Sequence, residues 1–166
     1  MNQNYIHTIT LYNRIQAADS EDKKEHWKRT VLHNCFWKAQ VNTGFNGTQA
    51  SVQNTYVVRI PENGRYLPYG ELLKGRVMEC EWRDVKGRII LDTEGNEIIL
   101  LKETTDSFTV SQGDIVIYGE CLEEITGVSG QTAAQVLNRH KPNAFKVTAF
   151  SDNTGFPLAK HYRLGG

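Results

Sequence analysis

The chain has 166 residues, of which 39% are hydrophobic and 23% are charged, and its 19 basic and 19 acidic side chains cancel. This composition is typical of one soluble globular domain over residues 1–166 and is too apolar for a disordered chain. The zero net charge argues against electrostatic capture by nucleic acid or by an acidic membrane surface. The first residues lack a signal-peptide pattern, and no stretch has the roughly 20 apolar residues of a spanning helix. We therefore expect synthesis in the cytoplasm and no membrane partner.

The first strand is predicted near the start of the chain, where apolar and polar residues alternate over residues 6–13. This period of two is typical of a β-strand and places Ile9 and Leu11 on the face toward the core. The strongly charged stretch that follows, residues 14–28, fits a solvated loop or a short exposed helix equally well.

Further strands and one long loop are expected before the middle of the chain. Residues 27–41 carry two strand-like pieces, and residues 56–60 form another strand that Pro61 ends, because proline cannot donate to a strand ladder. Between them, residues 42–54 are rich in Gly, Asn, Thr and Ser, which predicts a loop that buries little apolar surface. Residues 65–70 are expected to cross the molecule in an extended conformation.

Residues 71–105 are dense in charged side chains and contain one clear hairpin pattern. Apolar runs at residues 89–92 and 97–101 flank residues 93–96, whose types favour a tight turn. The segment either forms an inserted β-hairpin arm that stands off the main sheet or supplies two ordinary strands to it.

The strongest local pattern lies at residues 106–127. Residues 108–110 and 115–118 are β-branched and aromatic runs, which pack well on a pleated surface. Residues 111–114 between them supply turn chemistry, and Gly113 can adopt a positive φ without strain. The pattern predicts a strand, a tight turn and a second strand that form a hairpin.

One helix is predicted, over residues 132–140, where Ala, Gln and Leu favour helix. Thr132 or Ser129 can cap its start, and Pro142 ends it. The helix face that would pack on a sheet is formed by Ala133, Val136, Leu137 and His140.

Strands at residues 145–150 and 160–164 complete the pattern, the second of them within a C-terminal extension at residues 151–166. Many short strands, turns between them and one minor helix predict a mainly β fold. We expect a small β-barrel or sandwich with one short helix near the C-terminus, to which residues 71–105 add the hairpin described above.

Local spacing predicts no metal site. The five histidines contain no H-x-x-x-H or H-x-H pair, and no cysteine lies within four residues of another. His33 and Cys35 would share one strand face, but two ligands do not make a site. The histidines and cysteines are His7, His26, His33, His140, His161, Cys35, Cys80 and Cys121. Three widely spaced cysteines predict reduced, mostly buried thiols.

Catalytic signatures are not found either. Cys35 has no flanking motif of a catalytic nucleophile. Glu120, Glu123 and Glu124 are typical of solvated charges at the end of a strand. The sequence contains no phosphate-binding loop and no dinucleotide fingerprint. We therefore expect a protein that is not an enzyme and that uses no metal or other cofactor.

Three stretches of the sequence carry a family resemblance. They are T-I-T-L-Y-N with W-K-R-T-V-L-H-N-C-F-W near the start, F-T-V-S-Q-G-D-I-V-I-Y-G-E in the centre, and V-L-N-R-H-K-P-N-A-F-K-V-T-A-F-S-D-N-T running into K-H-Y-R-L-G-G at the end. Together they resemble the small neck proteins of tailed bacteriophages, of the head–tail joining or head-closure type. The ending is similar to proteins encoded among the structural genes of Firmicutes prophages. Residues 71–105 do not match the pattern.

The resemblance implies a structural virion protein, assembled in the cytoplasm of the bacterial host. Such proteins are small β-barrels that form a ring, here six- or twelve-fold, below the portal and adaptor proteins. The ring closes the DNA exit, contacts DNA passively in its channel and presents a surface to tail proteins. A loop commonly seals the channel, and the residues suited to that role are Gly44, Phe45, Asn46, Gly47, Glu94, Gly95 and Asn96.

A ring subunit needs a heterologous interface, in which one patch meets a different patch of the next copy. Exposed strand edges and the C-terminal tail are suited to add to a neighbouring sheet, and tyrosine is enriched at interfaces. The interface candidates are Tyr66, Tyr69, His161, Tyr162, Arg163 and Leu164. For each of them, a half-buried position within its own subunit is the alternative.

Two other functions remain open. A tail-completion or tail-terminator protein would use a similar small fold. A nucleic-acid-binding barrel of the OB type would need a basic groove with stacked aromatic rings, of which Phe36, Trp37 and Lys38 supply a fragment. A DNA affinity that falls steeply with salt would favour the OB-type barrel.

Overall fold

The computed structural model describes residues 5–20, 23–46, 49–74, 76–81, 86, 88–91, 93–95, 97, 99–103 and 107–166. Within these residues the fold is mainly β, as the sequence predicts. The strands are β1 (His7–Ile15), β2 (His26–Asn46), β3 (Gln49–Pro61), β4 (Arg76–Glu81), β5 (Ile99–Glu103), β6 (Ile115–Tyr118), β7 (Ala144–Lys146), β8 (Ala149–Asp152) and β9 (His161–Gly165). The helices are the 3-10 turn η1 (Ala17–Asp19), α1 (Tyr69–Lys74) and α2 (Ala133–His140).

Seven strands form one antiparallel sheet in the order β7-β6-β1-β2-β3-β9-β8. The two edge strands, β7 and β8, are consecutive parts of one segment and are separated by Val147 and Thr148. The Val147 N–H donates to the Asp114 carbonyl oxygen at 2.7 Å, on the side of β6. The Thr148 N–H donates to the Gly165 carbonyl oxygen at 2.9 Å, on the side of β9. The sheet is therefore curled until both of its edges meet on residues 144–152.

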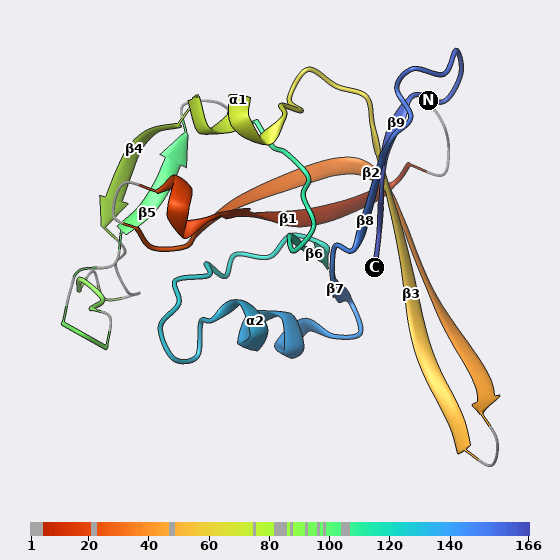
Figure 1. Cartoon of the computed structure of the whole chain (residues 1–166), viewed down its shortest axis with the longest axis horizontal. Helices are drawn as coiled ribbons and strands as arrows, with labels where there is room; N and C mark the ends of the chain where they lie inside the picture. Colours follow the sequence, from red (N-terminus) through yellow and green to blue (C-terminus); the bar gives the residue numbers. More distant parts are fainter. Residues whose placement is uncertain are drawn as a thin grey trace.

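Strand β1 lies inside this sheet, between β6 and β2, and is buried on both faces. Ile9 and Leu11 point into the main core, which confirms the prediction for these two residues. Tyr12 points to the opposite face and packs in a second cluster with Val136 of α2. The helix covers that outer face of the sheet, as Figure 1 shows. Its start has the predicted cap, because the Thr132 side chain accepts from the Gln135 N–H in a reciprocal capping box.

A two-stranded arm projects from the body of the molecule (Figure 1). Strand β2 pairs with β1 up to Cys35 and then with β3 from Phe36 onward. In the described part of the chain, residues 42–46 and 49–54 pair with each other and with no third strand. The prediction of a long loop at residues 42–54 is therefore wrong. A projecting ribbon needs only its own ladder of backbone hydrogen bonds, so its low apolar content did not exclude strands.

Of the two alternatives for residues 71–105, the described residues agree with strands that stand apart from the main sheet. Strand β5 pairs with β4, and these two strands form a sheet separate from the seven-stranded one. Around the turn expected at residues 93–96, Leu91 forms an antiparallel bridge with Glu97, and the described residues 93–95 are exposed. Residues 92, 96 and 98 lie outside the described residues. Helix α1 was not predicted, and the extended conformation expected for residues 65–70 is wrong at Tyr69 and Gly70, where the helix begins. Proline directly before a helix favours such a start. The Pro68 carbonyl oxygen accepts from the N–H groups of Glu71 and Leu72.

Two predicted strand arrangements are corrected. Residues 111–114 do form a turn with Gly113 at φ 95°, but β6 pairs with β1 and β7, and Phe108 instead bridges to Tyr66. The central hairpin is therefore absent. Residues 145–150 form two strands because the chain changes its partner from β6 to β9. Among the described residues, no helix combines the length and the apolar character needed to cross a bilayer.

Candidate functional site

The predicted C-terminal interface strand lies inside the sheet. Strand β9 pairs with β3 on one side and with β8 on the other, so its backbone is not offered to a neighbouring chain. Tyr162 and Leu164 are buried in the main core, and only His161 and Arg163 lie on the opposite face. The expectation that residues 161–164 add to a neighbouring sheet is therefore wrong for the main chain, because that edge is already occupied.

Two further interface candidates, Tyr66 and Tyr69, contact residues of their own chain. The Tyr66 ring stacks on Tyr162 with a centroid distance of 4.4 Å and also contacts Phe108 and Phe150. The Tyr69 hydroxyl donates to Asp19 at 2.8 Å and accepts from the Gln16 N–H at 3.1 Å. Both side chains remain partly exposed.

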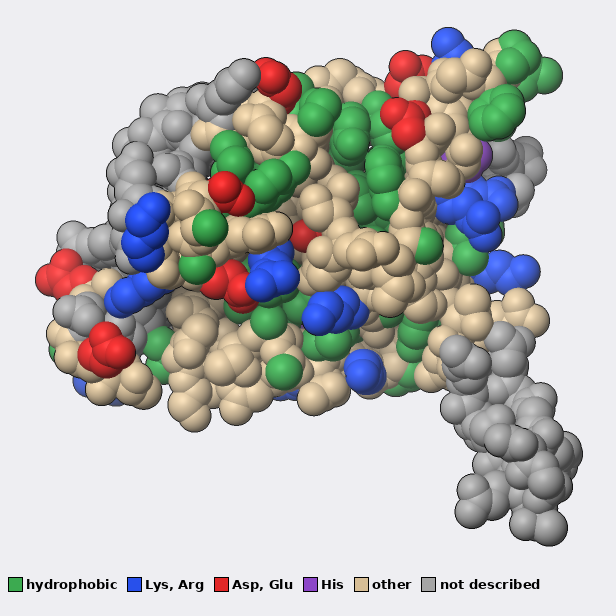
Figure 2. All heavy atoms as spheres, in the orientation of Figure 1, with side chains coloured by type: hydrophobic (Ala, Val, Ile, Leu, Met, Phe, Trp, Pro, Cys, Tyr) green, Lys and Arg blue, Asp and Glu red, His purple; other side chains and the backbone are tan. Residues whose placement is uncertain are grey.

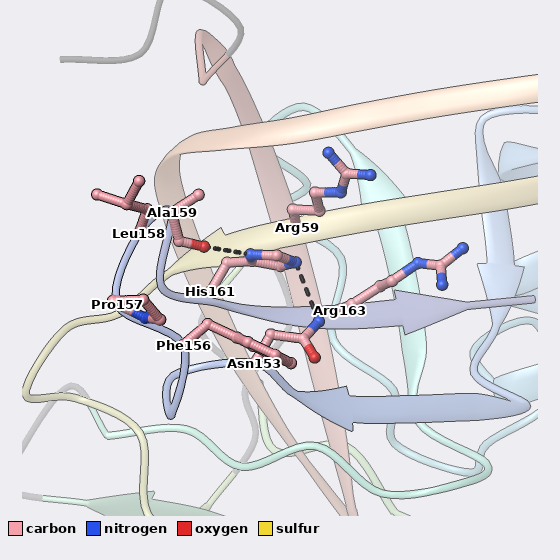
Figure 3. Close-up of a pocket in the computed structure, with 8 residues that line it drawn as sticks. All are labelled: Arg59, Asn153, Phe156, Pro157, Leu158, Ala159, His161 and Arg163. Atoms are coloured by element: carbon pink, nitrogen blue, oxygen red, sulfur yellow. Dashed lines mark hydrogen bonds between the residues drawn. The ribbon is translucent and has the colours of Figure 1, made fainter.

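A shallow hollow of about 630 Å³ lies on the outer face of β9 (Figure 3). Arg59 of β3 and Arg163 of β9 are paired directly across the two strands. The turn after β8 completes the hollow with Phe156 and Leu158, which are 61% and 83% exposed. Figure 2 shows hydrophobic and basic side chains gathered at this end of the molecule.

His161 holds this turn in place. One ring nitrogen, Nδ1, lies 2.6 Å from the Ala159 carbonyl oxygen, and the other, Nε2, lies 3.1 Å from the Asn153 amide nitrogen. The result is a fixed surface on which two guanidinium groups stand beside exposed apolar side chains. Such a surface suits a protein partner that offers a carboxylate and an apolar side chain.

The predicted sealing residues are divided between the arm and the 93–97 turn. Gly44, Phe45 and Asn46 belong to β2 in the projecting arm. Glu94 and Gly95 lie in the exposed turn before Glu97, where Gly95 has a φ of 86°. Gly47 and Asn96 lie outside the described residues.

The pair His33 and Cys35 does not share a strand face. Asn34 between them has a φ of 57°, which breaks the alternation of the strand. His33 is exposed and lies 3.1 Å from the Thr8 hydroxyl, whereas Cys35 is buried in the main core. Burial raises the pKa of the Cys35 thiol to about 12. A thiol with such a pKa is protonated at neutral pH and is a poor nucleophile.

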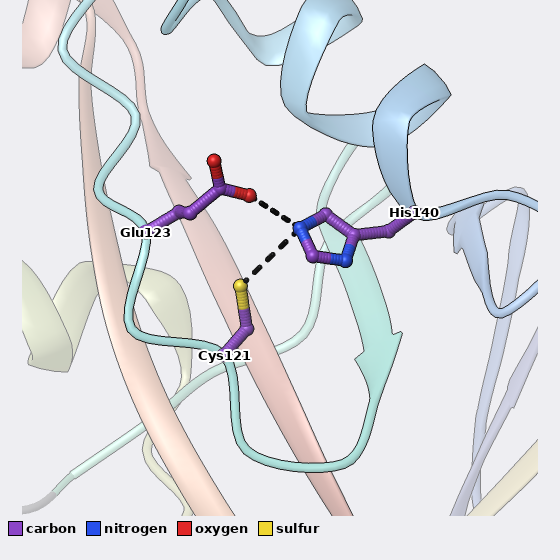
Figure 4. Close-up of side chains that lie close together, drawn as sticks. All are labelled: Cys121, Glu123 and His140. Carbon is purple, nitrogen blue, oxygen red and sulfur yellow. Dashed lines mark hydrogen bonds and ion pairs between the residues drawn. The ribbon is translucent and has the colours of Figure 1, made fainter.

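A cluster that local spacing did not predict lies between α2 and the segment after β6 (Figure 4). It consists of Cys121, Glu123 and His140, whose possible ligand atoms all lie within 4.8 Å of one another. Cys121 Sγ lies 3.6 Å from His140 Nε2, and Glu123 Oε2 is paired with the same nitrogen. The one sequence signal was the helix face that contains His140 together with Val136. In the described part of the chain, this is the group suited to hold a metal ion.

Charged and polar neighbours fix the cluster. The Arg139 guanidinium lies 3.0 Å from Glu123 Oε1. Partial burial alone would raise the pKa of Glu123, but its hydrogen bond with His140 and its pairing with Arg139 lower that pKa below the usual value. The Tyr12 hydroxyl donates to the Glu123 carbonyl oxygen at 2.7 Å, and the Cys121 N–H donates to Thr10 Oγ1 at 2.8 Å.

Comparison with known proteins gives a family without an assigned activity. No curated protein and no solved structure matches the chain. The model of a family of unknown function, DUF6751, matches residues 5–166. Because this match covers almost all of the sequence, the chain belongs to the family of unknown function DUF6751.

Proposed function

We propose that this chain is a structural, non-catalytic subunit of the neck of a tailed bacteriophage. It would form a head-closure or connector ring that joins the DNA-filled head to the tail. Besides the resemblance of its sequence to such proteins, one structural observation supports this proposal most directly: the β2–β3 arm projects from a curled sheet and pairs only with itself in the described residues.

The arm extends beyond the body of the molecule (Figure 1). At about 3.3 Å per residue, the strand from residue 42 to residue 46 extends the arm by roughly 15 Å. In a ring, one arm from each copy would meet at the axis or lie across the next subunit. The arm would then take the sealing role that the resemblance to neck proteins implies for a loop.

The hollow beside β9 supplies a second supporting feature. Arg59 and Arg163 are directly opposite each other on neighbouring strands, and like charges in this arrangement are unfavourable. A carboxylate from the next copy would relieve that repulsion, while exposed Phe156 and Leu158 would gain apolar contact. Two different patches meeting in this way form the heterologous contact from which a closed ring is built.

The aromatic residues that an OB-type barrel would offer to nucleic acid are used within the chain. The Trp37 ring contacts Tyr56, Tyr118 and Phe145 at centroid distances of 5.8, 5.4 and 5.5 Å. The Phe36 ring is covered by the Arg59 guanidinium at 5.2 Å. These contacts favour a neck protein over a nucleic-acid-binding barrel. Binding of labelled single-stranded DNA that weakens steeply with salt would reverse this preference.

The proposal is tested by electron microscopy of phage particles made with and without this protein. We expect particles without it to lose DNA or to remain tailless, and wild-type protein supplied in trans to restore them. Heads that keep their DNA and accept tails without it would contradict the proposal. Antibody labelling of free tails at the end that joins the head, with no labelling of DNA-filled tailless heads, would indicate the tail-completion or tail-terminator alternative.

Two variants connect the structure to this test. In the first, residues 43–52 are replaced by Asn-Gly, which keeps the pairing of Asn42 with Gln53. In the second, Arg163→Glu reverses the charge in the hollow. Both proteins should fold and yet fail to restore the particles. Lys160→Glu, an exposed charge reversal close to the hollow, is the matched control and should restore them.

A further inference from the structure

Three side chains of the types that bind transition metals converge on one point at the base of α2. Cys121 and Glu123 come from the segment after β6, and His140 comes from the last turn of the helix. The thiol and the carboxylate both approach the same ring nitrogen, His140 Nε2 (Figure 4). The positions of these atoms distinguish a catalytic relay from a metal-binding site.

A catalytic relay needs a different arrangement. In a nucleophile–histidine–acid relay, the nucleophile uses one ring nitrogen and the orienting carboxylate uses the other. Here both groups use Nε2, so Glu123 cannot orient the imidazole toward the Cys121 thiol. An arrangement in which sulfur, nitrogen and oxygen surround one point is that of a chelating site.

We propose that Cys121, Glu123 and His140 bind a divalent transition-metal ion, with Zn²⁺ as the preferred ion. Tetrahedral zinc with bonds of about 2.3 Å to sulfur and about 2.0 Å to nitrogen places these two atoms roughly 3.5 Å apart. The distance between Cys121 Sγ and His140 Nε2 is 3.6 Å. The sulfur and the nitrogen therefore already stand at the separation that one zinc ion requires.

The carboxylate completes the protein ligands after a small movement. Glu123 Oε2 is hydrogen-bonded to His140 Nε2, and the metal would take the place of the hydrogen in that bond. Binding also removes the proton of the Cys121 thiol, and the buffer accepts both protons. The Glu123 and His140 side chains are 36% and 31% exposed, so the carboxylate has room to move and water can supply a fourth ligand.

The surroundings support the site and balance its charge. A thiolate and a carboxylate neutralise a divalent ion, and Arg139 remains on the second carboxylate oxygen of Glu123. The backbone of Cys121 and Glu123 is hydrogen-bonded to the side chains of Thr10 and Tyr12 in β1. A bound ion would join α2 to the segment after β6 and stabilise the fold.

The test uses purified chain, freed of metal with a chelator and of any purification tag. Zn²⁺ titrated in a calorimeter should bind at one ion per chain and raise the unfolding temperature. Co²⁺ should give a thiolate charge-transfer band, which reports a cobalt–sulfur bond directly. Cys121→Ser should lose that band, and His140→Asn should lose stoichiometric binding. Cys35→Ser is the matched control, because Cys35 is also buried but lies in the other core. This variant should keep both the cobalt–thiolate band and stoichiometric zinc binding.

A second measurement leaves all three proposed ligands unchanged. In a Cys35→Ser, Cys80→Ser chain, Cys121 is the single remaining thiol. Zn²⁺ should slow its alkylation by iodoacetamide, and excess chelator should restore the rate. Absence of the cobalt–thiolate band in the wild-type chain, or an alkylation rate unaffected by Zn²⁺, would overturn the proposal.

Discussion

The side-chain amide of Asn13 donates a 2.9 Å hydrogen bond to the carboxylate of Asp114, 101 residues further along the chain. The same amide donates to the Thr109 carbonyl oxygen at 2.5 Å, and the Thr109 N–H donates back to Asn13 at 3.2 Å. Asp114 also accepts from the N–H groups of Arg14 and Ser111 and is completely buried. This network fixes the turn before β6 against β1, and β6 and β1 are neighbouring strands of the sheet.

The first prediction concerns the dependence of stability on pH. Burial raises the pKa of Asp114 to about 6, against the opposing hydrogen bonds from Arg14, Ser111 and Asn13. Between about pH 6 and about pH 4, the folded chain therefore holds a proton that the unfolded chain has lost. Through Asp114, the free energy of unfolding should increase as the pH falls through this range, by roughly 3 kcal/mol at most.

Urea unfolding of the wild type and of Asp114→Asn at several pH values measures this contribution. Asp114→Asn should be less stable at every pH, because its amide nitrogen faces N–H donors, and should lack the Asp114 part of the pH dependence. Asp152→Asn, at an exposed position, is the control and should keep it. Parallel pH curves for the wild type and Asp114→Asn would contradict this prediction.

The second prediction separates a core role of Tyr162 from an interface role. Tyr162→Ala removes a buried ring that stacks on Tyr66 and should lower the free energy of unfolding by about 3 to 5 kcal/mol. Tyr162→Phe keeps the ring and should cost less than about 1.5 kcal/mol. Arg163→Ala, at the next and exposed position, should change stability by less than about 0.5 kcal/mol. Equal stability of Tyr162→Ala and wild type in urea would return Tyr162 to the interface candidates.

The third prediction concerns the start of α2. Thr132→Ala removes the side chain that accepts from the Gln135 N–H and should cost about 1 kcal/mol. Thr132→Ser retains a hydroxyl at the cap and should stay close to wild type. Thermal unfolding followed by circular dichroism measures the difference. Equal unfolding temperatures for the alanine and serine variants would show that the cap does not limit the stability of the helix.

The fourth prediction concerns the exposed turn before Glu97. Replacing residues 93–96 by Asn-Gly shortens the turn without touching the seven-stranded sheet. The variant should unfold cooperatively, with a free energy within about 0.5 kcal/mol of wild type. A broad, non-cooperative transition would show that this segment belongs to the core.

Local sequence patterns predicted where single strands and the helix α2 lie better than they predicted which strands pair with one another. The alternation around Ile9 and Leu11 and the helical face of α2 depend on nearby residues, and both predictions are confirmed. The partners of β6 depend on contacts across the molecule, so the local turn at Gly113 was interpreted as a hairpin turn. Composition was misleading at residues 42–54, because a projecting ribbon needs no apolar face.

The metal-site candidate was missed for a related reason. His140 and Cys121 are 19 residues apart and meet because Val136 and Ile117 pack α2 on the outer face of the sheet. The spacing of possible ligands within one helix or one strand does not reveal that contact. A helix face that contains a histidine among apolar residues was the available signal, and it gave no information about the partner.

The position of β9 between β3 and β8 has a consequence for the order of events during synthesis. Strand β3 ends at residue 61 and β9 begins at residue 161. At about 5–20 residues per second, a ribosome needs roughly 5 to 20 s to deliver the missing strand. During that delay the backbone groups of β3 that pair with β9 have no partner. Chaperones or a second copy of the chain can bind to such an open strand edge. Closure of the sheet must therefore follow translation of β9, and a ribosome that stalls before residue 161 releases a product unable to mature.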